Sequence, residues 1–98
     1  MTDTTIHLLA HLVPQPGQEA ALAEALRAMI PSVLTEPGCI AYAAHESLET
    51  PGVIVMIEAW ADQAALDAHA ALLGWSEAGA KLGALLAHPP ALERLRRI

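Results

Sequence analysis

Four residues of the 98-residue chain could together hold an aromatic ligand and move a proton: Tyr42, Glu58, Trp60 and His69. Glu58 and Trp60 are two positions apart, so on a strand their side chains point to the same face. His69 falls on the inward stripe of the helix expected next, and a histidine is the usual general base near neutral pH. A carboxylate on an apolar strand also needs a donor, for which His69, an arginine or a backbone N–H are candidates. The set therefore indicates either a reactive pocket or a structural hydrogen-bonded cluster.

Other histidines and the single cysteine are poorer candidates for chemistry. On a strand, His7 and His11 lie about 13 Å apart, which is too far for them to share one metal ion. Cys39 and His45 have the same parity on a second predicted strand and lie about 20 Å apart, so this histidine cannot activate the thiol. The sequence contains no phosphate loop, zinc-type cysteine pair or nucleophile-elbow serine. We therefore expect no metal site, and we interpret Cys39 as a structural thiol.

The elements that must position the four residues follow from the spacing of apolar side chains. Residues 6–13 predict a strand with neither face strongly polar. Apolar positions at spacings of three and four predict a helix over residues 17–35, in which Pro31 should cause a kink or a new turn. Residues 39–48 predict a second strand, and a turn at residues 49–52 leads into a central strand at residues 53–60.

The second half of the chain predicts more helix and a last strand. Asp62 is the expected N-cap of a helix, and Gly74 should interrupt that helix. A further helical stretch should run from residue 75 to about residue 87, before two prolines and a strand at residues 91–98. The expected inward stripe of the first of these helices consists of Leu66, His69, Leu72 and Leu73.

The predicted order is strand, helix, strand, strand, helix, strand. Helices on one face of a four-stranded antiparallel sheet satisfy this order, which is the α+β ferredoxin-like arrangement βαββαβ. The chain length suits a single domain, 1–98, with one core. Hydrophobic residues make up 54% of the chain and charged residues 16%, which exceeds the apolar content that one small core hides. We therefore expect a homodimer that covers the second face of the sheet.

Charge and hydropathy exclude some kinds of binding partner. The formal net charge of −6 repels phosphate backbones, and the basic cluster of Arg94, Arg96 and Arg97 is typical of a solvated strand face. The sequence has no apolar run of the roughly 18 residues that a membrane span needs, and Met1 is not followed by a basic and then an apolar region. A single cysteine fits a reducing compartment. We expect a cytoplasmic protein that binds neither nucleic acid nor membrane.

Three segments of the chain resemble hallmark segments of the antibiotic biosynthesis monooxygenases. They are a Glu-Pro-Gly-Cys turn with a following tyrosine in residues 33–42, a Glu-x-Trp strand in residues 54–60, and an Ala-Leu-x-x-His helix in residues 65–69. Their order and spacing are those of the family, and the compatible pattern extends over nearly the whole chain. The resemblance implies a ferredoxin-like sheet paired into a dimeric α/β-barrel, with a pocket between the sheet and the helices.

The similarity is greatest to the quinol monooxygenase branch, whose members use no metal, flavin or other cofactor. It implies that O2 oxidises a small aromatic quinol or hydroxy-aromatic substrate, with the protein supplying a dry pocket, orientation and a base. By motif position, His69 is the implied base and Glu58 the second catalytic residue, and Trp60 and Tyr42 shape the substrate site. The alternative is a homodimer that binds a small hydrophobic metabolite without turnover, or an isomerase on the same fold.

The sequence departs from the haem-degrading relatives that it otherwise resembles. Those relatives use an asparagine on the first strand and an axial histidine in the second helical region, where this chain has Ala10 and about Gly79. Haem binding is therefore not expected. Trp75 stands where the family often has another aromatic residue, so this position bears on the shape of the pocket.

Overall fold

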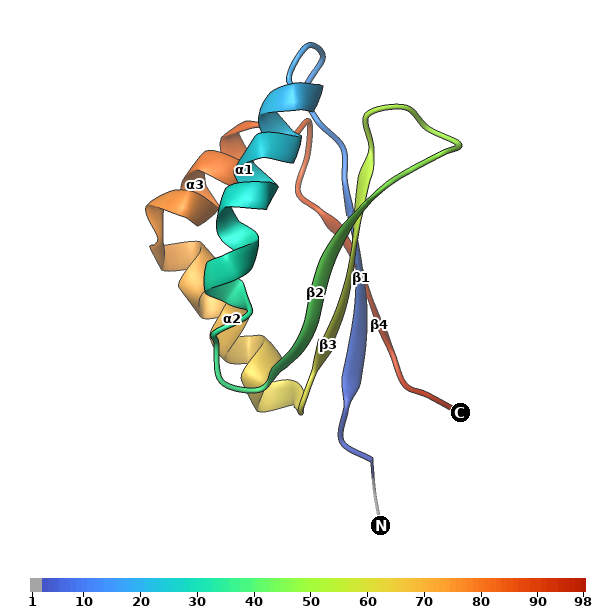
Figure 1. The fold of residues 1–98 in the computed structure, drawn as a ribbon, viewed down its shortest axis with the longest axis vertical. Coiled ribbons are helices and arrows are strands. Elements are labelled where there is room, and N and C mark those ends of the chain that lie inside the picture. The colour runs from blue at the N-terminus through green and yellow to red at the C-terminus, as the bar shows by residue number, and fades with distance from the viewer. Residues whose placement is uncertain (1–2) are drawn as a thin grey trace.

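The computed structural model describes residues 3–98 of the chain. Its elements are β1 (Ile6–Leu12), α1 (Glu19–Val33), β2 (Cys39–Glu46), β3 (Ile54–Trp60), α2 (Gln63–Trp75), α3 (Glu77–Ala84) and β4 (Ala91–Leu95). The strands form one antiparallel sheet in the order β2-β3-β1-β4, and the helices lie on one face of it (Figure 1). The predicted ferredoxin-like α+β fold is confirmed, with β3 inside the sheet and the second helical region divided into α2 and α3.

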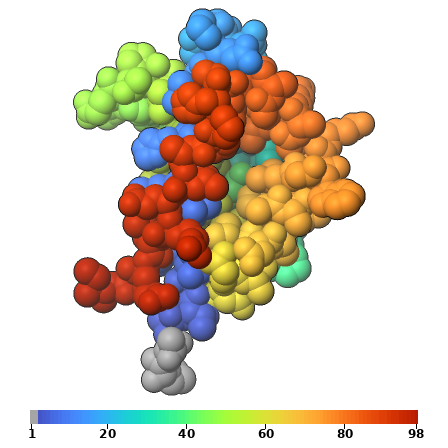
Figure 2. Space-filling view, turned by 180° about the vertical axis from the view of Figure 1, so that it is seen from behind, coloured from blue at the N-terminus to red at the C-terminus, as the bar shows by residue number. Residues whose placement is uncertain are grey.

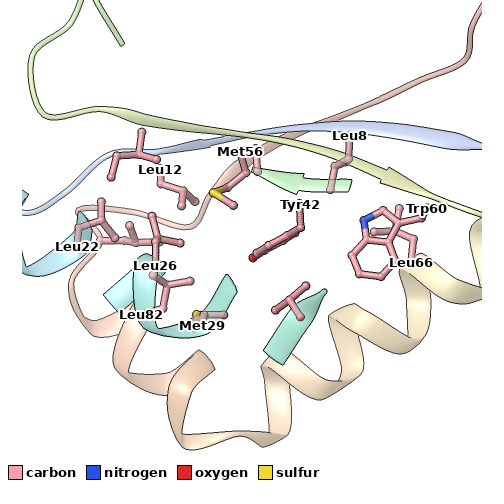
Figure 3. Close-up of a cluster of buried hydrophobic side chains, with 14 residues drawn as sticks. Leu8, Leu12, Leu22, Leu26, Met29, Tyr42, Met56, Trp60, Leu66 and Leu82 are labelled. Atoms are coloured by element: carbon pink, nitrogen blue, oxygen red, sulfur yellow. The ribbon is translucent and has the colours of Figure 1, made fainter. Parts of the chain in front are cut away.

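The core lies between the sheet and the helices because the side chains of β3 alternate. Ile54, Met56, Glu58 and Trp60 are buried, as their spacing predicts, whereas Ile57 on the opposite face is 45% exposed. Each large apolar side chain buried in this layer stabilises the fold by about 1.5–3 kcal/mol. Figure 3 shows the layer, which also includes Leu8, Leu12, Leu22, Leu26, Met29, Leu66 and Leu82.

The helices are interrupted at a different place from the one predicted. α1 continues through Pro31 and ends at Val33, because a missing N–H so close to the end affects only the last turn. α2 likewise continues through Gly74, since one glycine costs a helix only about 1 kcal/mol. The break comes at Ser76, whose backbone is extended and whose hydroxyl accepts a hydrogen bond from the Gly79 N–H at 3.0 Å. This N-cap starts α3 in a new direction.

A β-bulge changes the faces of β2. Cys39 pairs with Trp60 and Ala41 with Ala59, so one extra residue of β2 lies between two consecutive pairs. The shared parity expected for Cys39 and His45 is therefore wrong, because the bulge turns the two residues to opposite faces. The bulge also aligns Tyr42 with Glu58 on the face that the helices cover.

The sheet face opposite the helices is not covered by any other part of the described chain. Leu9 pairs with Ile57 and His7 pairs with Leu95 on this face, and Ile57 and Leu95 are 45% and 40% exposed. β4 is exposed along its whole length although it pairs with β1. Among the described residues, no helix is both long enough and apolar enough to cross a bilayer.

Candidate functional site

The fold brings the four predicted site residues into one cluster beneath the helices. Tyr42, Glu58, Trp60 and His69 are 5%, 4%, 0% and 4% exposed. Tyr42 and Glu58 are direct cross-strand neighbours, and Trp60 lies two residues further along the same face of β3. Asp62 caps α2 by accepting the Ala65 N–H at 2.8 Å, as predicted, and this start of the helix turns His69 inward.

Glu58 finds its donor on its own strand. The indole N–H of Trp60 donates to Glu58 Oε1 at 3.0 Å, so the donor is none of the three that the sequence suggested. Burial raises the pKa of the Glu58 carboxyl above its ordinary value, and the Trp60 hydrogen bond and His69 partly offset this rise. Glu58 can therefore exchange a proton closer to neutral pH than an exposed glutamate can.

His69 pairs with Glu36, the acid of the Glu-Pro-Gly-Cys turn, for which the sequence alone indicated no role. Its Nδ1 lies 3.0 Å from Oε1 of Glu36, and the Glu36 side chain is only 16% exposed. Glu36 stands in the turn between α1 and β2, 33 positions before its partner. The sequence does contain a signal for this pairing. Glu36 stands beside Pro37 and Gly38, in a turn that passes the start of the helix that carries His69.

Aromatic rings surround the histidine. The ring of His69 stacks on Trp60 with a centroid separation of 4.5 Å and an interplanar angle of 29°. Tyr42 meets the His69 ring edge-on at 5.4 Å, and in Figure 3 the labelled Tyr42 projects from the sheet toward the helices. Burial is the main cause that raises the pKa of the Tyr42 phenol well above its ordinary value of 10.0, so the phenol stays protonated at neutral pH. The cluster thus combines a hydrogen-bonded imidazole, a protonated phenol and a buried carboxyl group.

Two hollows lie beside the helices. The first, which we call the helix cavity, measures about 600 Å3 and lies between α1 and the α2–α3 pair, with Met29, Glu36, Ser76 and Lys81 among its walls. Figure 2 shows the second, between the C-terminal segment in red and the helices in orange, with green and teal atoms of the middle of the chain on its floor. The exposure of Leu92 on β4 is consistent with this opening. Leu92 is 65% exposed, although Ala10, its partner on β1, is buried beneath the helices.

Other residues considered from the sequence lie outside the cluster or are unsuited to chemistry. Burial, followed by the charges of Glu36 and Glu58, raises the pKa of the half-buried Cys39 thiol, which keeps it protonated. Trp75 is 90% exposed at the end of α2 and is not part of the buried core. Within residues 3–98, no three histidine, cysteine, aspartate or glutamate side chains are grouped to hold a metal ion.

Comparisons with known proteins agree with this fold. Residues 5–81 match the family described as antibiotic biosynthesis monooxygenase. Protein Rv0793 of Mycobacterium tuberculosis, named as a candidate monooxygenase, is 32% identical over 87 residues, which are 89% of this chain and 85% of that protein. Its solved structure is similar with a TM-score of 0.80 and 31% identity, over 96% of this chain and 95% of that one. PA3566 of Pseudomonas aeruginosa gives a TM-score of 0.83 at 29% identity, over 100% and 98% of the two chains.

Proposed function

This chain belongs to the antibiotic biosynthesis monooxygenase family, and we propose that it oxidises a small aromatic quinol or hydroxy-aromatic compound with O2, using neither metal nor flavin. The observation that carries the proposal is the buried His69 imidazole, which is stacked on Trp60, faced by Tyr42 and hydrogen-bonded to a carboxylate. This arrangement supplies an aromatic surface and a proton acceptor in one water-poor place.

The reaction balances without another reductant. Loss of a hydroxyl proton turns the quinol into an electron-rich anion, which reduces O2 directly. One oxygen atom forms a new bond to a ring carbon, and the other leaves as water with two hydrogens from the substrate. The quinol is thereby oxidised to a hydroxyquinone, so quinol and O2 yield hydroxyquinone and water. The protein contributes binding, orientation, exclusion of water and transfer of the proton.

The residues of the cluster have different roles in the proposed reaction. His69 accepts the hydroxyl proton of the substrate, because an imidazole can both take and return a proton near pH 7. Trp60 and Tyr42 bind the aromatic ring of the substrate and hold it against His69. Glu58 has a raised pKa through burial, so it provides a second proton-exchanging group beside the reacting ring. The substrate enters through the hollow beside β4, where the helices leave Leu92 uncovered.

The test compares the wild type with His69→Ala. Oxygen uptake with reduced naphthoquinols, corrected for autoxidation, should be rapid with the wild type and about 10²–10⁴-fold slower with the variant. Binding, followed as thermal stabilisation by the quinol, should persist in the variant. If His69 is only structural, folded His69→Ala loses stability by about 1–3 kcal/mol and keeps wild-type turnover per folded molecule. Stabilisation of the wild type without oxygen uptake would identify a binding protein, and a changed carbon skeleton without oxygen incorporation would identify an isomerase.

We further propose that the active form is a homodimer that closes the uncovered sheet face. The support is the apolar surface around Leu9, Ile57 and Leu95 and the exposure of β4 on both sides. Light scattering should give twice the monomer mass at micromolar concentration for the wild type. Ile57→Glu on this face should yield monomers, whereas Leu48→Glu, 92% exposed in the β2–β3 turn, should remain dimeric. A monomeric wild type, or a dimeric Ile57→Glu, would contradict the proposal.

A further inference from the structure

We propose that Glu36 is a positioning residue that fixes the tautomer of His69. Its carboxylate accepts a hydrogen bond from Nδ1–H, which leaves Nε2 as the ring nitrogen that can accept a proton. The inference deepens the proposed function and rests on it for the role of His69 as base. The contact itself is a property of the structure and can be tested without any substrate.

The turn that carries Glu36 is fixed on both sides of this residue. The Glu36 N–H donates to the Val33 carbonyl at 3.0 Å, and its own carbonyl accepts the Cys39 N–H at 3.1 Å. Two steps along, Gly38 has a positive φ of 81°, a conformation that residues with a side chain rarely adopt. The direction in which the Glu36 side chain leaves the backbone is therefore set by the turn.

The same turn is pressed against the start of α2. A Cβ at Gly38 would lie only 2.5 Å from the Cβ of Ala65, so only glycine permits this approach. The Gly38 carbonyl also accepts the Ala61 N–H at 2.8 Å. Ala65 lies four residues before His69, which places the two side chains on one face of the helix. Because Gly38 lies so close to Ala65, the Glu36 carboxylate reaches His69, one helical turn further along α2.

The tautomer of His69 follows from the chemistry of its partner, the Glu36 carboxylate. A carboxylate can only accept, so a neutral His69 must carry its proton on Nδ1 to make the 3.0 Å contact. Histidines in water favour the other tautomer only modestly, and a single charged acceptor is enough to select between the two. Without Glu36, the proton can move to Nε2, and the ring then presents a donor where the reaction needs an acceptor.

The experiment reads the tautomer directly. Long-range ¹H–¹⁵N correlation spectra of ¹⁵N-labelled protein, with the His69 signal assigned by its loss in His69→Ala, should show a protonated Nδ1 in the wild type. Glu36→Ala should shift His69 toward the Nε2–H form and lower turnover by at least about 10-fold, which is well below the roughly 10⁴-fold loss when the aspartate that holds a catalytic histidine in its tautomer is replaced. Glu36→Gln offers Nδ1 either an amide oxygen or an amide N–H, so it no longer selects one tautomer and should not restore either property fully. Glu24→Ala removes an exposed carboxylate on α1 that binds Arg27, and should change neither.

The outcomes separate this inference from the proposed function. If Glu36→Ala leaves the His69 tautomer unchanged, or changes it without affecting the turnover of an active enzyme, Glu36 is not a positioning residue. If the tautomer shifts as expected while the wild type consumes no oxygen, the pairing stands and the proposed function fails. Should Glu36→Ala not fold, Glu36→Met fills the same space without an acceptor and gives the same readout.

Discussion

Replacing Trp60 by phenylalanine tests whether the hydrogen bond from the indole N–H offsets the free-energy cost of burying the Glu58 carboxyl. The change removes the 3.0 Å hydrogen bond and keeps an aromatic ring in a site that is 0% exposed. A buried charged group that loses its donor costs about 1.5–3 kcal/mol, and the smaller ring adds a packing loss of about 1 kcal/mol. The free energy of unfolding should therefore fall by about 2.5–4 kcal/mol.

A double-mutant cycle separates the two contributions. In a Glu58→Met background no carboxylate is left to satisfy, so Trp60→Phe should cost little beyond the packing loss. Urea denaturation at one fixed protein concentration should give a coupling energy of about 1.5–3 kcal/mol between the two positions. The same substitution at Trp75, which is 90% exposed, serves as the control and should change stability by less than about 0.5 kcal/mol. Additive costs in the cycle would refute the view that Trp60 stabilises Glu58 through this bond.

Three further changes test other parts of the structure. Glu58→Gln should gain stability relative to the wild type as pH rises above about 4.5. The pKa of Glu58 is higher in the folded state than in the unfolded chain, so the wild type loses stability as this proton is released. A stability difference between the two proteins that does not vary with pH in urea titrations would disprove this. Asp62→Ala should lose about 1 kcal/mol through the lost cap of α2, and an unchanged melting temperature would show that the cap is dispensable. Gly38→Ala should cost more than Gly17→Ala, since both have positive φ but only Gly38 has Ala65 in the way; equal melting temperatures would show that the turn can move away.

The sequence was sufficient for the elements whose determinants are local. Alternation along residues 54–60 predicted the buried face of β3, and Asp62 predicted the start of α2 correctly. Together these two features place Glu58, Trp60 and His69 around one point, so most of the candidate site could be predicted. Tyr42 joins them because strand pairing sets it opposite Glu58.

The parts that the sequence did not reveal depend on contacts between distant segments. The partner of His69 comes from a turn 33 residues earlier, and its placement depends on how closely Gly38 can approach Ala65. The bulge in β2 reflects the register against β3, which no pattern within β2 displays. The break at Ser76 rather than Gly74 shows that a capping side chain decided where the helix ended, although glycine is the weaker helix former.

The most direct test of the proposed monooxygenase activity is the fate of the two oxygen atoms. Purified protein should be incubated with a reduced naphthoquinol under ¹⁸O2, and the product should be analysed by mass spectrometry alongside a sample without protein. We predict that each product molecule gains one ¹⁸O atom per O2 consumed, that the second atom appears in water, and that His69→Ala slows this incorporation in proportion to its loss of oxygen uptake. Oxygen uptake no faster than autoxidation, or quinone formed without label and with hydrogen peroxide as the reduced product, would contradict the account.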